Sequence, residues 1–481
     1  MADPTPADES TPTATIPATA NRSTTPNSDA FRDFIFSGWA ERPDATPSPR
    51  AQAAFAAARR IRLSERFPGA TLVIPAGPAK VRSNDTDYLY RAHSAFSHLS
   101  GWASDTVPGS VLVIGPGDGT PATLYFTPTA GRDTEEFYAN AAIGEFWTGP
   151  RPSLAHVAAD LGLTTRALPE LEAPGERVLV LRGVDPAADE LAPASADEAE
   201  LERAVSELRL VKDAYEIAEL RTAVAATKRG FDDVVAELPH IVAHPRGERV
   251  VDGTFYRRAR IEGNALGYDT IAAAGPHACT LHWTRNDGPI TAGELLLLDA
   301  GVELDSLYTA DITRTLPVSG RFTEVQRRVY EAVREAADAA FAIVRPGIRF
   351  RDIHAEAMKV IAARTAEWGL LPVSAEESLE PGLQYHRRYM VHGTSHHLGI
   401  DVHDCAQARR ELYLDGVLEP GMVFTIEPGL YFQPDDLTVP DEYRGIGVRI
   451  EDDILVTSDG AENLSADIPR TADEVEAWLA R

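Results

Sequence analysis

Cysteine is nearly absent from this chain of 481 residues, which contains only Cys279 and Cys405. Two thiols cannot form the disulfide framework of a small secreted protein, so the cysteine content indicates a reducing compartment. Each cysteine is close in sequence to a histidine of interest, which leaves a chemical role for the thiol open. A small buried filler is the favoured interpretation, because free cysteine is among the most buried residue types.

Positive charge and long apolar runs are also scarce. Lys and Arg number 46 against 73 Asp and Glu, which gives a formal net charge of -27 and a pI of about 4.9. Without a basic cluster, the chain is not expected to bind the phosphate backbone of nucleic acid. No apolar run approaches the ~18 residues needed to span a bilayer, and the N-terminus lacks the pattern of a signal peptide. We therefore expect a soluble, cytoplasmic protein with no nucleic-acid or membrane partner.

The length predicts two or three domains, at about 100 to 200 residues each. β-rich runs alternate with helical patterns in the first part of the chain, which indicates an α/β domain. Helices are predicted at 51–62 and 154–162, and strands at 70–77, 110–117, 122–128 and 177–183. The proposed division is a disordered tail (1–30), the α/β domain (31–183), a linker and helix (184–212) and a second domain (213–481).

Three segments of the first half carry further predictions. The tail is rich in Thr, Pro, Ala and Ser and has almost no large apolar groups, so it cannot offset its ordering entropy. Residues 82–102 are dense in aromatic and polar groups without a clear period, and are predicted to be a structured loop. A long helical pattern runs from Leu201 to Val224. Four aromatic residues are expected to pack onto the α/β domain: Phe31, Phe34, Phe36 and Trp39.

Four acids follow short apolar runs in the second half of the chain. Asp299 follows four leucines at the end of a predicted strand, and Asp311 follows a second short run beside it. Later in the chain, Glu427 and Glu451 also follow short apolar runs. A single Asp at this place is usually a turn residue or helix cap. Buried acids repel each other unless a cation lies between them, so four acids in two related halves predict a metal site. Period-2 alternation puts Arg449 on the same face as Glu451, where an ordinary salt bridge is an equal alternative.

Histidines are concentrated between residues 392 and 403. His392, His396, His397 and His403 lie beside Gly393 and Gly399. Gly393 stands where the glutamate of an HExxH zinc motif would be, which excludes that motif. A lone histidine such as His282 is more often structural, but four in one stretch favour a site. Four carboxylates with one imidazole suit hard divalent cations and balance two of them, roughly 3.5 to 4 Å apart, with a shared water of pKa near ~7.

Four motifs, LLLLDAGVELDSLYTADITRTLPVSGRF, VHGTSHHLGIDVHD, FTIEPGLYF and GVRIEDDILV, resemble those of the pita-bread metallopeptidases, specifically aminopeptidase P. The segment RSNDTDYLYRAHSAFSHLSGW resembles the N-terminal domain that aminopeptidase P shares with prolidase and creatinase. The resemblance runs from about residue 51 to the C-terminus. It implies an α+β protein with a C-terminal pita-bread catalytic domain preceded by a smaller α/β N-terminal domain.

The resemblance also implies a role for each site residue. Asp299 would bind one metal, Asp311 and Glu451 would bridge both, and His396 and Glu427 would complete the other. His403 would stabilise the tetrahedral intermediate, and His392 and His282 would line the scissile bond. Glu427 would also shuttle the proton, Arg449 would support the ligands, and Tyr268 would lie near the entrance and contact substrate. The loop between Asp299 and Asp311 is one residue longer than the common family pattern.

The activity that the resemblance implies is release of the first residue from peptides with proline second, by attack of a metal-bridging hydroxide. Two divalent ions are expected, with manganese first and cobalt or zinc as alternatives. Prolidase, which takes only dipeptides, is the nearest alternative, although HGTSH looks more like aminopeptidase P. The intact ligand set argues against creatinase and against a non-catalytic pita-bread protein. Dimers or tetramers occur among relatives, so a homo-oligomer is expected.

Overall fold

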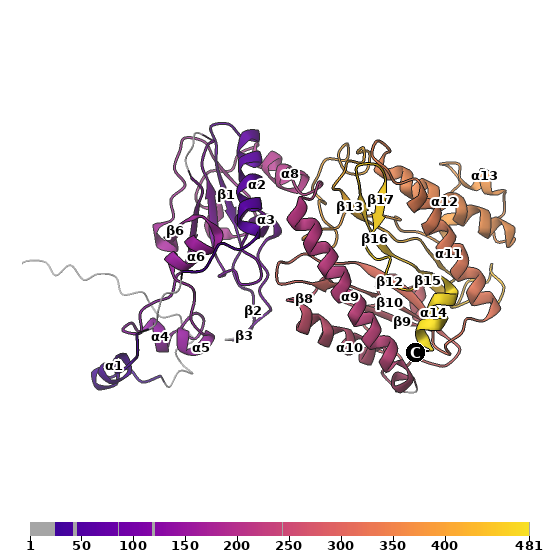
Figure 1. Cartoon of the computed structure of the whole chain (residues 1–481), viewed down its shortest axis with the longest axis horizontal. Helices are drawn as coiled ribbons and strands as arrows, with labels where there is room; N and C mark the ends of the chain where they lie inside the picture. The colour runs from indigo at the N-terminus through magenta and orange to yellow at the C-terminus, as the bar shows by residue number, and fades with distance from the viewer. Residues whose placement is uncertain (1–24, 42–45, 85, 118–120, 243, 481) are drawn as a thin grey trace, which may run out of the picture.

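The computed structural model describes residues 25–41, 46–84, 86–117, 121–242 and 244–480, which form two lobes (Figure 1). Each lobe has its own hydrophobic core. Leu72, Phe96 and Leu124 belong to the core of the N-terminal lobe. Leu296 and Phe424 belong to the larger core of the C-terminal lobe. None of the helices in the described part of the chain is long and apolar enough to cross a bilayer.

A five-stranded sheet with the order β6-β5-β4-β1-β7 forms the centre of the N-terminal lobe. β1 pairs antiparallel with β4 and parallel with β7, while β5 pairs antiparallel with β4 and parallel with β6. The four predicted strands and both predicted helices are confirmed, and β6 is an additional strand. The bounds are α2 (Gln52–Arg66), β1 (Thr71–Pro75), β4 (Val111–Ile114), β5 (Thr123–Phe126), α6 (Leu154–Leu161), β6 (Thr164–Ala167) and β7 (Val178–Val180).

The predicted loop over 82–102 is wrong, because it contains regular structure. β2 (Val81–Ser83) and β3 (Thr86–Asp87) form a hairpin, and α3 (Ser94–Ser100) follows it. Every residue of α3 is buried. A helix that is buried on all sides has no amphipathic stripe, so the helical period is missing from its sequence.

The single helical pattern predicted from Leu201 onward is also divided in the structure. α7 (Pro186–Asp189) lies within the predicted linker, and α8 (Glu198–Glu207) follows it. The chain then leaves the helix, with a bridge between Val211 and Met422, before α9 (Ala214–Ile241) begins. The Asp213 carboxylate caps α9 by accepting hydrogen bonds from two backbone N–H groups of its first turn.

The predicted tail lies mostly outside the described residues, which begin at Thr25. Helix α1 (Asp29–Phe36) includes the last two residues of the predicted tail, and the Ser28 hydroxyl caps it. α1 lies beside α4 (Glu136–Ala139) and α5 (Glu145–Thr148) in Figure 1. Packing of the aromatic residues is confirmed for three of them, through Tyr138 and Phe137, but Phe34 is 75% exposed.

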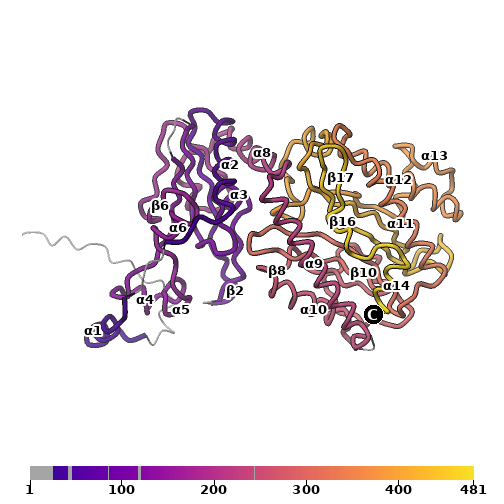
Figure 2. The backbone as a smooth tube through the Cα atoms, in the orientation of Figure 1, coloured from indigo at the N-terminus to yellow at the C-terminus, as the bar shows by residue number. Residues whose placement is uncertain are grey.

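Short antiparallel sheets form the centre of the C-terminal lobe. Their orders are β12-β10-β9, β13-β16-β17, β14-β15 and β11-β8. Figure 2 shows β10 and β16 between the helix pair α9 and α10 and the helix pair α11 and α12. This arrangement confirms the predicted α+β class. The strand bounds are β8 (Ala265–Leu266), β9 (Ile271–Ala274), β10 (Leu295–Ala300), β11 (Val302–Glu303), β12 (Ile312–Pro317), β13 (Val423–Ile426), β14 (Gly429–Tyr431), β15 (Gly447–Arg449), β16 (Asp452–Val456) and β17 (Ala461–Asn463).

Helices and 3-10 turns cover these sheets. The long helices α10 and α12 pack against α9 and α11, respectively. The 3-10 turn η3 precedes the segment that carries His282, and η4 precedes the segment of the clustered histidines. The bounds are α10 (Gly247–Glu262), η3 (Gly275–Cys279), α11 (Glu324–Ala342), α12 (Phe350–Glu367), α13 (Ala375–Ser378), η4 (Tyr385–Arg388) and α14 (Ala472–Leu479).

Candidate metal centre

The hairpin of β10 and β12 brings Asp299 and Asp311 together. The Tyr268 hydroxyl lies 2.6 Å from Asp299 Oδ1 and 2.5 Å from Asp311 Oδ1. A phenol has one proton, so it donates to one carboxylate at a time. Tyr268, which we expected near the entrance, thus lies with its hydroxyl against both of these acids. Burial, followed by the charges of both acids, raises the pKa of the Tyr268 hydroxyl well above its usual value.

The loop between the two aspartates, which we expected to be one residue longer than the common family pattern, does not keep them apart. The connection turns at its far end, where Leu304 N donates to Tyr308 O over 3.0 Å and Leu307 N donates to Leu304 O over 2.8 Å. Leu307 adopts a φ of 72°, a left-handed conformation that is rare for leucine. The cost is offset by burial, since this side chain is fully inaccessible. The turn of this loop thus lies at the far end from the acids.

Gly301 permits the two strands of this hairpin to approach each other. A Cβ atom at this position would lie 1.8 Å from Ala310 O, far inside van der Waals contact. The glycine of the LLLLDAG motif is therefore a steric requirement of the geometry that joins Asp299 to Asp311.

Glu451 enters the site from the segment between β15 and β16. Its backbone N–H donates to Thr313 O over 3.1 Å, and its Oε2 accepts a 2.7 Å hydrogen bond from the Thr313 hydroxyl. Thr313 lies opposite Asp299 in the β10–β12 register. The predicted alternation of side chains along residues 449–452 is confirmed. Arg449 and Glu451 both lie at the site, whereas Asp452 forms an ion pair with Arg314.

Arg449 pairs with Asp299, and the alternative of a salt bridge to Glu451 is not realised among the described ion pairs. Its Nε also donates to Thr313 Oγ1 over 3.2 Å, and its Nη1 donates to Tyr431 OH over 3.1 Å. The guanidinium is only 4% exposed. It holds one acid and two hydroxyl groups in fixed positions behind the site.

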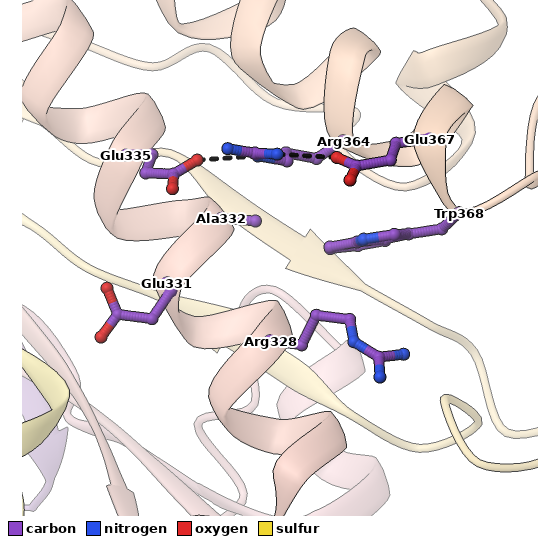
Figure 3. Close-up of a pocket in the computed structure, with 7 residues that line it drawn as sticks. All are labelled: Arg328, Glu331, Ala332, Glu335, Arg364, Glu367 and Trp368. Atoms are coloured by element: carbon purple, nitrogen blue, oxygen red, sulfur yellow. Dashed lines mark hydrogen bonds and ion pairs between the residues drawn. The ribbon is translucent and has the colours of Figure 1, made fainter.

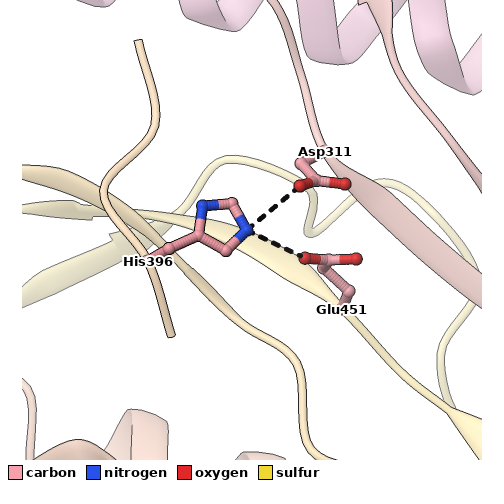
Figure 4. Close-up of side chains that lie close together, drawn as sticks. All are labelled: Asp311, His396 and Glu451. Atoms are coloured by element: carbon pink, nitrogen blue, oxygen red, sulfur yellow. Dashed lines mark ion pairs between the residues drawn. The ribbon is translucent and has the colours of Figure 1, made fainter. Parts of the chain in front are cut away.

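His396 completes the cluster from the opposite side. Its Nε2 lies 3.2 Å from Asp311 Oδ2, 3.6 Å from Glu427 Oε1 and 4.0 Å from Glu451 Oε1. Figure 4 shows this imidazole pointing at Asp311 and Glu451. Asp311, His396 and Glu451 offer ligand atoms within 4.8 Å of one another, a spacing that one metal ion can serve. β13 delivers Glu427 next to this group, and Thr425 N donates to His396 O over 2.9 Å.

The pKa values of the clustered acids are shifted because several like charges are buried close together. Burial, outweighing the opposing charges of His396 and Arg449, raises the pKa of Glu427 to about 7. Burial and then the charge of Asp311 raise the pKa of Glu451 well above its usual value. Burial opposes the charged imidazole of His396, but Asp311 and Glu427 raise its pKa to about 9. Oxygen donors with one imidazole and surplus buried negative charge fit divalent cations.

The remaining predicted histidines surround this cluster at different depths. His392 Nε2 lies 2.8 Å from Tyr431 OH, and burial followed by the charge of Arg449 lowers the pKa of His392 to about 3. The His403 ring is exposed and lies 4.3 Å from the His396 ring, centroid to centroid. Partial desolvation by the surrounding site, followed by the charge of His396, lowers the pKa of His403, with a smaller contribution from the exposed His282. His397 points away from the acids and stacks on Phe350.

Three residues of the site were missed from the sequence. The hydroxyl groups of Thr313 and Tyr431 have a role only through the side chains that they contact in the folded protein. No sequence pattern therefore identifies these two residues. Asp453, in contrast, had a signal, because period-2 alternation places it on the side of Glu451. Its Oδ2 accepts a 3.2 Å hydrogen bond from Asp311 N, and burial raises the pKa of this carboxyl well above its usual value.

Both cysteines are buried, as the favoured interpretation requires. Burial raises the pKa of the Cys279 thiol to about 12, and burial together with Asp404 raises that of Cys405. A protonated thiol is a poor nucleophile, so neither cysteine is suited to chemistry at neutral pH.

A hollow of about 460 Å³ lies on the helical face between α11 and α12 (Figure 3). Arg364 spans it and donates to Glu335 over 2.8 Å and to Glu367 over 2.6 Å. None of the predicted site residues lines this hollow, and its acids are already paired with arginine. The chemistry therefore belongs to the acidic cluster.

Comparison with known proteins places these features in a family. Residues 218–458 match the model of metallopeptidase family M24, and residues 56–174 match that of the aminopeptidase P N-terminal domain. The chain is 55% identical over 454 residues to Xaa-Pro aminopeptidase 2 of Streptomyces coelicolor, which covers 92% of this chain and 94% of that protein. It is 33% identical over 447 residues to the Xaa-Pro aminopeptidase of Escherichia coli, covering 88% and 96%, respectively.

Solved structures agree with these matches. Aminopeptidase P from Escherichia coli with the inhibitor Pro-Leu superposes with a TM-score of 0.76 at 31% identity, covering 90% of this chain and 99% of that one. The aminopeptidase of Pseudomonas aeruginosa gives a TM-score of 0.77 at 30% identity with the same coverage. The expected pita-bread catalytic domain and its N-terminal companion are thereby confirmed. The chain belongs to metallopeptidase family M24 and, within it, to the aminopeptidase P group.

Proposed function

We propose that this chain is a metal-dependent aminopeptidase that releases the first residue from peptides with proline at the second position. The observation that carries this proposal is the convergence of Asp311, His396 and Glu451, with Glu427 beside them, on one point. The relatives named Xaa-Pro aminopeptidase support the substrate class, since the chain resembles them over almost its whole length.

The proposed ligands divide between two divalent ions. Asp299 would hold one ion, Asp311 and Glu451 would bridge both, and His396 and Glu427 would complete the second. Manganese is our first choice, with cobalt or zinc as alternatives. When bound, the ions would supply a bridging hydroxide at neutral pH and would polarise the scissile carbonyl.

The side chains around these ligands would handle substrate and protons. Asp299, held by Arg449, would accept a hydrogen bond from the free α-amine and so fix the N-terminal register of the peptide. Glu427 would take a proton from the attacking water and return it to the proline nitrogen. His403 would donate to the carbonyl oxygen as negative charge develops on it.

Proline explains why the rim of the site would consist of imidazoles. The imide nitrogen of Xaa-Pro has no hydrogen, so an enzyme that grips a backbone N–H at this position cannot process the bond. His392, whose pKa is about 3, stays neutral, and it would line the scissile bond together with His282. Tyr268, whose hydroxyl lies against Asp299 and Asp311, would also contact substrate near the entrance.

The wider setting forms part of the same proposal. The N-terminal domain would span residues 31–183, followed by a linker and helix over 184–212 and a catalytic domain over 213–481. The low cysteine content supports a cytoplasmic location. We also propose a homo-oligomer, either a dimer or a tetramer.

A panel of peptides tests the function. The purified full chain would be loaded with manganese, cobalt or zinc and given an Xaa-Pro tripeptide, the dipeptide Gly-Pro and a proline-free tripeptide. Release of the first residue from the Xaa-Pro tripeptide alone is expected. Cleavage confined to Gly-Pro would identify a prolidase, and no cleavage with any metal would indicate a non-catalytic protein that kept the fold.

A further inference from the structure

The side chain of Arg91, in the segment before α3, reaches from the N-terminal lobe into the C-terminal lobe. Its Nε donates to Glu303 Oε2 over 2.7 Å, and its Nη2 donates to Ile400 O over 2.5 Å. The same Nη2 lies 3.2 Å from Asp401 Oδ1. One guanidinium thus contacts two segments of the other lobe that are almost 100 residues apart in sequence.

Both of these segments carry proposed metal ligands. Glu303 lies in β11, four residues after Asp299 in the same hairpin. Ile400 and Asp401 lie between His396 and His403. The two segments also meet through their backbones, because Thr309 N donates to Gly399 O over 3.1 Å. Asp311 and His396 link these two segments at the centre of the site. Arg91 therefore links the same two segments at their outer side.

The groups around Arg91 form a satisfied polar network. Its Nη1 donates to the Ser94 hydroxyl over 3.0 Å, and that hydroxyl donates to Asp401 Oδ1 over 2.5 Å. Glu303 Oε1 accepts a 2.8 Å hydrogen bond from Asn264. Glu303 is only 4% exposed, so without Arg91 it would be left as a buried acid with no opposing charge at contact distance.

The second acid of the network is less dependent on Arg91. Asp401 is 34% exposed, and Arg209 provides another cation at 3.8 Å. Removal of Arg91 would therefore act chiefly on Glu303, and through it on the hairpin of Asp299 and Asp311. The effect is therefore predicted to be larger at Asp299 and Asp311 than at His396.

We propose that Arg91 is a positioning residue that holds the two ligand segments at the spacing that metal binding requires. It touches neither metal nor substrate, and it makes the N-terminal lobe a working part of the metal centre. This inference rests on the proposed function, because it assumes that Asp299, Asp311 and His396 bind metal.

Manganese affinity of the full chain tests the proposal without relying on turnover. Free manganese would be titrated by its paramagnetic resonance signal against the wild type, Arg91→Ala, Arg91→Lys and Glu303→Gln. Arg91→Ala is expected to weaken binding by about ten-fold, the lower end of the loss that follows removal of groups that orient metal ligands, because Arg91 acts on the ligand segments and not on the ligands themselves. Arg91→Lys is expected to fall in between, because an ammonium cannot reproduce the fork of donors.

Arg66→Ala is the matched control. Arg66 is also in the N-terminal lobe and donates to Glu207 of α8 over 2.7 Å, away from the ligand segments. Its manganese affinity should equal that of the wild type. Affinity of Arg91→Ala within two-fold of the wild type, or equal weakening by Arg66→Ala, would overturn the proposal. If Arg91→Ala does not fold, the manganese affinity of Glu303→Gln, which removes the same ion pair, is judged by the same two-fold limit.

Failure of the proposed function would look different. A wild-type chain that binds no manganese, cobalt or zinc would overturn the metal centre and this inference with it. A wild type that binds manganese but releases no residue from an Xaa-Pro peptide would overturn the proposed function alone, since the affinity series would still measure the role of Arg91.

Discussion

The Thr313 hydroxyl donates a 2.7 Å hydrogen bond to Glu451 Oε2 and thereby joins the β10–β12 hairpin to the segment that carries the fourth acid. Two proposed bridging ligands, Asp311 and Glu451, come from these two parts of the chain. The side chain that joins them is neutral and fully buried.

Thr313→Val is expected to loosen this connection. The substitution keeps the shape of the side chain but removes the donor to Glu451 and the acceptor for Arg449. We expect a loss of about 1 to 3 kcal/mol in unfolding free energy. Manganese affinity should also fall by about ten-fold. Thr313→Ser, which retains the hydroxyl, is the control and should remain close to the wild type. Equal behaviour of the two variants in denaturant titration would contradict the role of the hydroxyl.

Glu427→Ala should abolish release of the residue that precedes proline. Loss of a positioned proton carrier costs about 10² to 10⁴-fold in rate, and this variant also loses a proposed ligand. Turnover of an Xaa-Pro tripeptide would be measured after loading with excess manganese, with bound metal determined in parallel. Near-normal turnover by the loaded variant would sink the assignment of Glu427 as the proton shuttle.

Metal loading should release protons near neutral pH. In the metal-free chain the pKa of Glu427 is about 7 and that of His396 is about 9, so at pH 7 His396 is protonated and Glu427 is about half protonated, and a metal must displace these protons. Apparent affinity should therefore rise as pH increases from 6 to 8. Calorimetric titration in two buffers with different ionisation enthalpies measures the number of protons. Identical heats in both buffers would contradict the prediction.

His354 should make stability sensitive to mild acid. Burial, with a smaller contribution from Arg387, lowers its folded pKa to about 4, while the unfolded value is about 6.5. The unfolded chain therefore binds this proton first, and the stabilisation present above pH 6.5 is lost as pH falls towards 4. The loss from this residue should reach about 2 kcal/mol at pH 5.

His354→Gln isolates this contribution. Unfolding free energy would be measured by denaturant titration at pH 7 and pH 5 for both chains. The difference between the two pH values should be about 2 kcal/mol smaller in the variant. The same pH dependence in both chains would show that His354 takes up its proton equally in the folded and unfolded states.

Much of the candidate site could be predicted from local sequence, because the ligands lie in short motifs. An apolar strand ending in an acid places Asp299 and Glu427 without knowledge of their neighbours. Helix α3 could not be predicted in the same way. All of its residues are buried, so the pattern on which amphipathic prediction depends is absent.

The sequence by itself determined the identity of the acids and histidines, the α+β class and the likeness to a metallopeptidase, since each depends on residues close together in the chain. Only the tertiary structure decided which other side chains hold these acids and histidines in place. Tyr268 contacts an aspartate 43 positions away, and Arg91 contacts an acid 212 positions away. A hydroxyl or a guanidinium gains its role from the partner that folding brings to it, and no local pattern encodes so distant a partner.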